Sequence, residues 1–323
     1  MSEVLGLVGD IGGTNGRFAL VKGSPDHPRI DGPRTLPNRD HASAEAAIDA
    51  YLKARGAEKP ARVVLAVAGP VSEGAIHFTN LDWRLSEKGL CRDAGFKAAR
   101  LVNDFAAQAM GAAHLPDEAR RRIGPDVAAA SNAPLAIMGP GTGFGMGVLA
   151  DRSEPPCILS TEAGHIGFAP VDDEEVEVWR WLKRRHGRVS IERVLSGKGL
   201  EELYQALAEI GGEPARFGDG REVQAAAEAG DGLAARTVER FCLILGSAAG
   251  DLTLATGARG GVYVTGGVAQ GLADRICSGG FRSRFESKGR FEAYMQAIPT
   301  FLVTDGYTAL RGAARLVGGM EAA

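Results

Sequence analysis

The sequence predicts an α/β protein of two domains, in which helices cover mixed β-sheets. Short apolar runs typical of buried strands alternate with segments whose apolar residues recur every three or four positions. The length of 323 residues suits two domains, because a domain usually takes about 100–200 residues. A pattern of strand, glycine turn and strand heads each half, at residues 4–21 and 135–150, which indicates a faint internal duplication.

The first half is predicted to form a mixed sheet with helices packed on it. Residues 4–8 are apolar except for one glycine, which is typical of a strand covered on both faces. Further strands are predicted at residues 18–21, 29–36, 62–67, 75–78 and 99–102, and helices at residues 43–55 and 105–113. The first of these helices has its apolar side chains on one face.

The second half is predicted to be richer in helix. We expect it to begin near the start of residues 116–133, a segment that is first charged and then small and polar. Strands are predicted at residues 135–138, 148–150, 261–265 and 300–304, and helices at residues 174–185, 197–210, 231–256 and 307–316. The helix over residues 231–256 has the most regular apolar period.

Composition and charge exclude several classes of protein. A formal net charge of -3 gives no reason to expect nucleic acid or an anionic membrane as partner. The four cysteines lie far apart without a C-x-x-C pair, so a structural zinc site is not expected. The chain shows no secretory signal, and no run reaches the roughly 18 apolar residues of a membrane span. We therefore expect a soluble, cytoplasmic protein with reduced cysteines.

The 45 glycines are about twice the usual share, and many of them gather in two turns. The first turn contains Gly9, Asp10, Gly12, Gly13, Thr14 and Asn15, and the second contains Gly141, Thr142 and Gly143. Backbone amides in such turns form a concavity that suits anionic oxygens. The alternative is a tight hairpin that only needs positive φ. Two such turns predict a phosphate held from two sides.

The run of apolar residues before Asn103 and Asp104 predicts a strand that ends in an amide and a carboxylate. An alkyl hydroxyl is too weak an acid to ionise at neutral pH, so its attack on phosphorus needs a carboxylate that accepts the proton. Residues at the carboxyl ends of strands in open α/β sheets face the ligand crevice. Asp104 is therefore the candidate general base. The alternative is that one of the two residues only caps the following helix.

Further polar residues suit a sugar, whose hydroxyl groups both donate and accept hydrogen bonds. Glu162 and His165 lie three residues apart on a short loop that contains glycine, and Asn80 lies between aromatic residues on another loop. Those aromatic residues are more often buried core than the floor of a sugar site. Glu192 follows a serine at a helix start, where the dipole favours an acidic residue. For Glu192 the sequence alone favours this structural role.

A series of motifs follows one another along the chain. They are Gly9-Asp10-Ile11-Gly12-Gly13-Thr14-Asn15, Phe78-Thr79-Asn80 with Trp83, Val102-Asn103-Asp104-Phe105, Gly141-Thr142-Gly143, Glu162 with Gly164-His165, Arg193-Val194-Leu195-Ser196-Gly197 and Thr265-Gly266-Gly267-Val268. In residues and order they resemble the motifs of the ATP-dependent glucokinases of Gram-negative bacteria. The resemblance extends from residue 5 to about residue 316.

The resemblance implies a two-domain actin-like ATPase (ribonuclease H-like) fold with an interdomain cleft. It implies a small α/β domain from residues 1–114 and 305–323 and a large α/β domain from residues 115–304. The implied reaction transfers the γ-phosphoryl group of ATP to the 6-hydroxyl of D-glucose and gives glucose 6-phosphate and ADP, the first step of glucose catabolism. The implied cofactor is ATP with Mg²⁺, and the implied assembly is a homodimer.

The resemblance also implies a role for each candidate residue. Asp104 is the general base, and the residues that hold glucose are Asn80, Asn103, Asp104, Glu162, His165 and Glu192. The two glycine turns hold the phosphates of ATP, and Gly266 and Gly267 lie by the adenosine. Asp10 is the candidate contact to the metal of Mg-ATP. One departure is Gly167, since an acidic residue is common in this family at the corresponding position.

Two alternatives come from other classes of protein. A sugar-sensing repressor would need a DNA-binding helix-turn-helix, whereas the first predicted strand begins near residue 4. The repressor, open reading frame and kinase family also usually carries a cysteine-rich zinc motif, and residues 166–170 contain no cysteine. An actin-like ATPase that remodels proteins would use the glycine turns, but it would have no need of the polar residues that suit a sugar.

Overall fold

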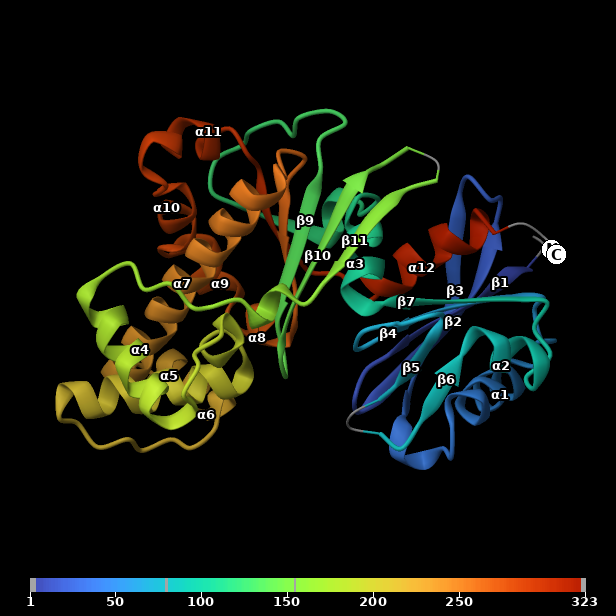
Figure 1. Ribbon diagram of the computed structural model, residues 1–323, viewed down its shortest axis with the longest axis horizontal. Coiled ribbons are helices and arrows are strands. Elements are labelled where there is room, and N and C mark those ends of the chain that lie inside the picture. Colours follow the sequence, from blue (N-terminus) through green and yellow to red (C-terminus); the bar gives the residue numbers. More distant parts are fainter. Residues whose placement is uncertain (1–3, 79–80, 154, 321–323) are drawn as a thin grey trace. The chain divides into compact units, whose positions relative to one another are not determined.

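The computed structural model describes residues 4–78, 81–153 and 155–320. The chain forms two compact units (Figure 1). The first unit comprises Met1–Leu115, Ser153–Ser160 and Asp305–Ala323, and the second comprises Pro116–Arg152 and Thr161–Thr304. Each unit combines a β-sheet with helices, so the predicted α/β class is confirmed.

The first unit contains a five-stranded sheet in the order β3-β2-β1-β4-β7. Its strands are β1 (Val4–Ile11), β2 (Asn15–Gly23), β3 (Pro28–Pro37), β4 (Arg62–Val67) and β7 (Ala98–Asn103). Strand β2 is antiparallel to both β1 and β3, whereas β1, β4 and β7 run parallel. Ile11 pairs with Val67, and Val67 pairs with Asn103. The carboxyl ends of the three parallel strands therefore lie level at one edge of the sheet.

Helices cover both faces of this sheet (Figure 1). They are α1 (Ala44–Arg55), α2 (Glu87–Arg92), α3 (Asp104–Ala112) and α12 (Thr308–Gly318), and a small hairpin is formed by β5 (Ala75–His77) and β6 (Arg84–Ser86). Because side chains alternate along a strand, Leu7 and Leu65 point into a core with Ile48 of α1. On the opposite face, Gly6 of β1 lies against Val317 of α12.

Two glycines let α3 and α12 approach each other closely. A Cβ atom on Gly312 would lie 1.8 Å from the carbonyl oxygen of Ala107, and one on Gly111 would lie 2.0 Å from that of Thr308. Neither position leaves room for a side chain. This contact attaches the last helix of the chain to the helix that begins at Asp104.

The second unit contains five strands of a six-stranded sheet in the order β11-β10-β9-β12-β13-β8, and the remaining strand, β11, lies mostly within Ser153–Ser160 of the first unit. The strands of this sheet are β8 (Arg120–Ile123), β9 (Leu135–Pro140), β10 (Phe144–Asp151), β11 (Cys157–Thr161), β12 (Val262–Val264) and β13 (Thr300–Val303). Strands β9, β12 and β13 are parallel, and β10 is the antiparallel partner of β9. The second glycine turn joins β9 to β10.

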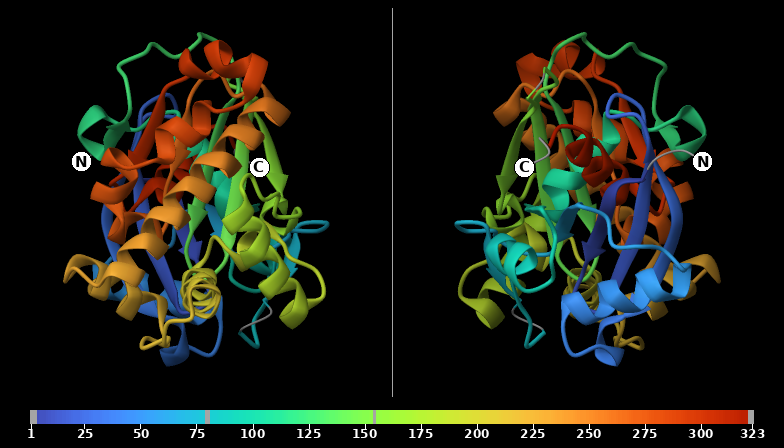
Figure 2. Two further views of the ribbon diagram at one scale, coloured as in Figure 1. Left: turned by 90° about the vertical axis from the view of Figure 1, so that its left-hand side faces the viewer. Right: turned by 90° about the vertical axis from the view of Figure 1, so that its right-hand side faces the viewer.

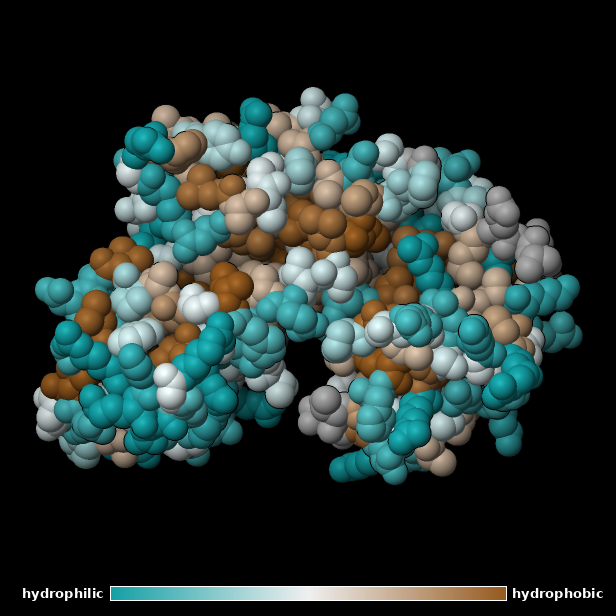
Figure 3. Space-filling view, in the orientation of Figure 1, coloured by the Kyte–Doolittle hydropathy of each residue, from teal (hydrophilic) through white to brown (hydrophobic). Residues whose placement is uncertain are grey.

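The helices of the second unit lie over this sheet. In the left view of Figure 2 they face the viewer, in yellow to red, in front of the green strands. They are α4 (Asp173–His186), α5 (Gly197–Gly211), α6 (Gly220–Glu228), α7 (Gly232–Thr256), α8 (Gly267–Gly271), α9 (Ala273–Ser278), α10 (Phe281–Glu286) and α11 (Glu292–Gln296). The surface over α4 to α6 is mainly hydrophilic (Figure 3). Among the described residues, no helix is both long enough and apolar enough to cross a lipid bilayer.

Capping explains why the longest helix begins and ends where it does. The side chain of Asp231 accepts the N–H of Ala234 over 2.9 Å at the start of α7, and Gly257 ends the helix with a φ of 65°. Asp is a favourable N-cap, and glycine adopts the left-handed conformation without strain. The prediction of a helix over residues 231–256 is confirmed.

Several parts of the structure after residue 116 differ from the prediction. Arg120–Ile123 forms the edge strand β8 within a segment predicted to be a polar passage. Its three consecutive arginines hide the alternation of a strand, and charged residues are common on edge strands. Strand β11, helix α6 and helices α8 to α11 were not predicted. The sequence of α8 to α11 offers little signal. Each has only five or six residues, which is too short to show a helical period.

Candidate active site

The first glycine turn joins β1 to β2, and Asn38 holds it from one side. The N–H of Gly12 donates to the carbonyl oxygen of Asn15 over 3.0 Å and closes the turn. The Nδ2 atom of Asn38 donates to the carbonyl oxygen of Gly12 over 2.8 Å, and its backbone N–H donates to that of Thr14 over 2.9 Å. Three carbonyl groups of the turn and the N–H of Gly12 are thus engaged, and a phosphate would use the other N–H groups of the turn.

Asp10 precedes the turn and faces Arg17 across the hairpin. The Arg17 Nη1 and Asp10 Oδ2 atoms lie 3.1 Å apart, and the Asp10 side chain is 17% exposed. Burial raises the pKa of Asp10, and the charge of Arg17 only partly opposes this shift. Kinases usually hold Mg²⁺ by one or two carboxylates together with phosphate oxygens of the substrate. The carboxylate of Asp10, next to a turn that can bind phosphate, fits that pattern.

Asn103 and Asp104 lie at the carboxyl end of β7, and the structure assigns the cap to Asn103. Its Oδ1 atom accepts the N–H groups of Phe105 and Ala106 over 3.0 and 3.1 Å, and its Nδ2 atom donates to Gly69 O over 3.3 Å. Asp104 is the first residue of α3 and is half-buried. The sequence left open which of the two residues caps the helix, and the capping interpretation is right for Asn103.

The first unit places Asp104 and the first glycine turn at the same edge of its sheet. Asn103 pairs with Val67, and Val67 with Ile11. Neighbouring strands lie about 4.8 Å apart, so the ends of β1 and β7 are about 10 Å apart. A turn suited to phosphate and a half-buried carboxylate therefore share one edge. Asn80, the remaining candidate of this unit, lies outside the described residues.

The second glycine turn is held by residues that follow it by about 50 positions in the chain. The N–H of Gly141 donates to Gly143 O over 2.8 Å, and Gly141 O accepts the N–H of Gly197, also over 2.8 Å. The Oε2 atom of Glu192 accepts the N–H of Phe144 over 2.8 Å. A Cβ atom on Gly143 would lie 2.6 Å from that oxygen. Glycine at position 143 therefore makes room for the carboxylate of Glu192.

Glu162 and His165 lie beside the same turn. Glu162 precedes a single turn of 3₁₀ helix, Ala163–His165, which His165 ends, and both residues are exposed. A Cβ atom on Gly164 would lie 1.9 Å from Phe144 O, so this short helix packs directly on the start of β10. The three residues singled out in the sequence, Glu162, His165 and Glu192, thus all lie around Phe144.

The segment after His165 runs next to Glu192. The N–H of Ile191 donates to Ile166 O over 2.9 Å, and Gly167 pairs with Ser190 as an isolated antiparallel bridge. A Cβ atom on Gly167 would meet no atom within 4 Å. Packing therefore does not require the glycine that distinguishes this chain at position 167.

Gly266 and Gly267 follow β12 and lie at the end of β9. The N–H of Thr265 donates to Met138 O over 2.8 Å. Gly266 has a φ of 95°, and its Cβ would lie 2.4 Å from Pro140 O, so only glycine fits there. Gly267 begins α8 and has open space on its Cβ side. The second unit therefore brings its glycine turn, its acidic and imidazole groups and this glycine pair together.

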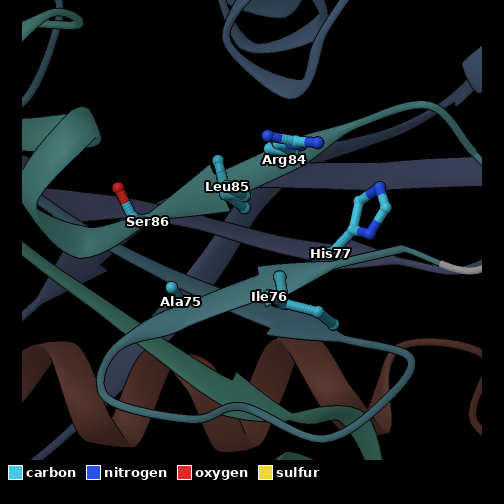
Figure 4. A pocket seen from close by; sticks show the side chains of 6 residues that line it. All are labelled: Ala75, Ile76, His77, Arg84, Leu85 and Ser86. Atoms are coloured by element: carbon cyan, nitrogen blue, oxygen red, sulfur yellow. The ribbon is translucent and has the colours of Figure 1, made fainter.

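Sequence reasoning missed Asn38 and the hydrogen bond from Phe144 to Glu192. Asn38 lies 26 residues after Gly12 and begins a 3₁₀ helix of three residues, Asn38–Asp40, which is too short to show a periodic pattern. A cavity of about 410 Å³ along β5 and β6 contains none of the described site candidates in its lining. Its polar side chains include His77 and Arg84, which pair across the hairpin (Figure 4).

Comparison with known proteins gives one consistent family. The family described as Glucokinase matches residues 7–319. A glucokinase of Caulobacter sp. (strain K31) is 51% identical over 310 residues, which cover 96% of this chain and 94% of that protein. One from Chromohalobacter salexigens is 44% identical over 307 residues and covers 95% of each chain.

Solved structures give the same result. The crystal structure of a glucokinase from an Antarctic psychrotroph has a TM-score of 0.89 and 37% identity, and the match covers 97% of this chain and 98% of that one. A glucokinase from Balamuthia mandrillaris has the same fold at 20% identity, with a TM-score of 0.77 over 97% and 93% of the two chains. The predicted two-domain actin-like ATPase fold is thereby confirmed.

Proposed function

Because the chain belongs to the glucokinase family, we propose that it transfers the γ-phosphoryl group of ATP to the 6-hydroxyl of D-glucose. The products are glucose 6-phosphate and ADP. The observation that supports this reaction most directly lies within the first unit. There, Asp104 follows β7 at the same sheet edge as the glycine turn that follows β1.

Asp104 acts as the general base. Its carboxylate accepts the proton of the 6-hydroxyl while the oxygen of that hydroxyl forms a bond to the γ-phosphorus of ATP. The bond from phosphorus to the bridging oxygen of the β-phosphate breaks, and ADP leaves with the electron pair. The Oδ1 atom of Asp104 also accepts the N–H of Phe105 over 2.9 Å. Because Asn103 accepts the N–H groups of both Phe105 and Ala106, the α3 terminus keeps this cap while Asp104 changes protonation state.

The glycine turns position ATP. The first turn, from Gly9 to Asn15, and the second, around Thr142, offer N–H groups to the phosphates, and Gly266 and Gly267 lie by the adenosine. Mg²⁺ bound with the nucleotide would neutralise phosphate charge, and Asp10 is the residue of this chain that we assign to it.

Glucose is held by Asn80, Asn103, Glu162, His165 and Glu192. Carboxylate oxygens accept from sugar hydroxyl groups, whereas amide and imidazole groups can donate or accept. In Glu192 one oxygen already accepts the N–H of Phe144, which holds the carboxylate in place for a sugar hydroxyl. In this proposal one carboxylate contacts both Phe144 and glucose. The sequence alone had favoured a different role for Glu192, an acidic residue placed by the helix dipole.

A coupled assay with a panel of sugars and phosphoryl donors tests the proposal. We expect the highest kcat/KM with glucose and ATP, and formation of one ADP for each glucose 6-phosphate. The panel includes mannose, fructose and glucosamine as acceptors, and ADP and polyphosphate as donors. Rapid ADP formation without any sugar would instead identify an ATPase, and a higher kcat/KM with another hexose would refute glucose as the preferred acceptor.

We further propose a cytoplasmic homodimer that binds neither nucleic acid nor membranes. We place its domain boundaries at residues 1–114 with 305–323 and at residues 115–304. Light scattering after size-exclusion chromatography measures the assembly. A monomeric mass at micromolar concentration would contradict the dimer.

A further inference from the structure

A second polar cavity lies in the first unit, at the tip of the hairpin formed by β2 and β3. Its volume is about 540 Å³, and its lining includes Ser24, His27, Arg29, His114 and Arg315. These residues come from the hairpin tip, the segment after α3 and the last turns of α12. A cavity of this size suits a small organic molecule, since ligand sites usually measure about 300–1,000 Å³.

The lining of this cavity is rich in basic groups. Two guanidinium groups and two imidazole rings line it, and the lining contains no carboxylate, although the whole chain has a net charge of -3. Within residues 4–78, 81–153 and 155–320, no carboxylate forms an ion pair with Arg29 or His27. Guanidinium groups match the geometry of phosphate oxygens and bind them in pairs of hydrogen bonds.

The hairpin tip is held against α12. Arg315 donates from Nη1 to the carbonyl oxygen of Asp26, and a Cβ atom on Gly318 would lie 2.5 Å from Pro25 O. Figure 1 shows the tip beside the end of α12. Because a guanidinium has five N–H donors, Arg315 keeps further donors for a ligand while it holds the loop.

The loop itself is also shaped by local contacts. Gly23 has a φ of 111°, and a Cβ atom there would lie 2.5 Å from His27 O. The N–H of His27 donates to Ser24 O over 3.1 Å and closes the turn. The basic side chains of the tip therefore project from a defined turn.

This cavity is separate from the nucleotide turn of the same unit. Strand β2 has 9 residues, with Asn15 of the glycine turn at one end and Gly23 at the other. At about 3.3 Å per residue, the two ends lie roughly 26 Å apart. An anion in the cavity therefore does not displace the phosphates of ATP from the glycine turn.

We propose that this cavity binds a small phosphate monoester, as a site distinct from the catalytic one. The two arginines and two histidines contact the phosphate, and the remaining volume accepts the organic part. Two elements connect the cavity to the catalytic residues, because β2 starts at Asn15 and α3 starts at Asp104. A bound ester therefore changes kcat or KM; this kinetic part alone rests on the proposed function.

Isothermal titration calorimetry with glycerol 3-phosphate tests the binding. The titration is done in excess ADP, so that the nucleotide site is filled, with glycerol and inorganic phosphate as comparison ligands. We expect one saturable site per chain that discriminates against both comparison ligands. Absence of saturable binding would overturn the proposal, and equal affinity for inorganic phosphate would overturn its specificity for an ester.

Three variants localise the site. Arg29→Gln removes a cation without a described ion pair and is expected to weaken binding about tenfold or more, as the loss of charge-assisted hydrogen bonds does. Arg315→Lys keeps a donor for Asp26 O and weakens binding less. The control is Arg92→Gln, which removes an exposed arginine of α2 and leaves the affinity unchanged. Wild-type affinity in Arg29→Gln would refute the assignment.

A kinetic measurement then separates this inference from the proposed function. Without ester, Arg29→Gln keeps the wild-type kcat and KM. With saturating glycerol 3-phosphate, kcat or KM changes in the wild type and in Arg92→Gln, but not in Arg29→Gln. Binding that is lost in Arg29→Gln supports the site even if the chain phosphorylates no sugar, because calorimetry needs no turnover. Identical kinetic responses of the wild type and Arg29→Gln would refute the coupling.

Discussion

The Oε2 atom of Glu192 accepts the backbone N–H of Phe144 over 2.8 Å and so holds the first residue after the second glycine turn. The two residues are 48 positions apart. One oxygen of Glu192 thus serves the turn, and we assign the carboxylate a second contact, to glucose. These two roles can be separated experimentally. The contact to Phe144 needs only an oxygen acceptor, whereas the contact to glucose depends on the charge of the carboxylate.

Glu192→Ala leaves the N–H of Phe144 without its acceptor, which costs about 1–3 kcal/mol of unfolding free energy, and it raises KM for glucose. Glu192→Gln keeps an oxygen acceptor, so we expect near wild-type stability but roughly tenfold lower kcat/KM, because a charged acceptor to the sugar is lost. Urea unfolding and steady-state kinetics measure both effects. Equal destabilisation by the two substitutions would show that the hydrogen bond is not the cause.

Asp104→Ala is expected to lower kcat by roughly 10²- to 10⁴-fold, the effect typical of a lost general base. The helix cap comes from Asn103, so we expect the variant to fold with an α3 terminus that remains capped. Asp104→Asn is the matched variant, since it keeps the size of the side chain but accepts no proton. A coupled assay gives kcat, and circular dichroism checks the fold. Wild-type kcat in either variant would exclude Asp104 as the base.

Asn103→Ala removes the cap of α3 and is expected to cost about 0.5–2 kcal/mol. Asn103→Asp keeps the oxygen that accepts from Phe105 and Ala106 but loses the Nδ2 donor to Gly69 O. We therefore expect the aspartate variant to be the more stable of the two, with KM for glucose raised in both. Denaturant unfolding compares them. If the alanine variant is as stable as the wild type, the capping bonds contribute nothing measurable.

The stability difference between the wild type and Asp10→Asn is expected to depend on pH. Burial raises the pKa of Asp10 above the ordinary value of 3.8, so folding favours the protonated carboxyl. This contribution is present below pH 3.8 and is lost as the pH rises through the raised pKa. Asp10→Asn does not titrate, so we expect it to be more stable than the wild type at pH 7, with a smaller difference near pH 4. Unfolding curves across this range measure the difference in unfolding free energy between Asp10→Asn and the wild type. A difference that does not change with pH would contradict the raised pKa.

Replacing Glu175, which is not among the site candidates, is expected to lower the stability of the fold. Its side chain is fully buried and lies 3.1 Å from Arg240 and 3.0 Å from Arg284. Glu175→Gln removes that charge from two half-buried guanidinium groups, which keep their ion pairs with Asp172. We therefore expect a loss of about 1.5–3 kcal/mol, the contribution typical of hydrogen bonds to charged groups. The control is Glu177→Gln, which breaks an exposed pair with Arg180 and costs about 0–1 kcal/mol. Urea unfolding compares the two, and a similar small loss in both would refute the role of burial.

The elements with regular local patterns could be predicted from the sequence. Helix α7 shows its apolar period, its N-cap Asp231 and its C-terminal Gly257 within one continuous segment. The two glycine turns between strands were also predicted, because glycine-rich turns that join apolar runs depend only on neighbouring residues. The short helices α8 to α11 and strand β8 lack such patterns, since their formation depends on packing against the rest of the second unit.

The sequence by itself determined the α/β class and the main strands and helices, and it offered most of the polar residues as candidates for the site. Only the tertiary structure decided how these residues are used. Asn103 is the N-cap of α3 because it ends β7 with an extended backbone, whereas Asp104 is already helical, and either residue type could have capped the helix. Asn38 and Glu192 hold the glycine turns through contacts across 26 and 48 residues. Contacts over such separations leave no local pattern, because folding alone brings the partners together.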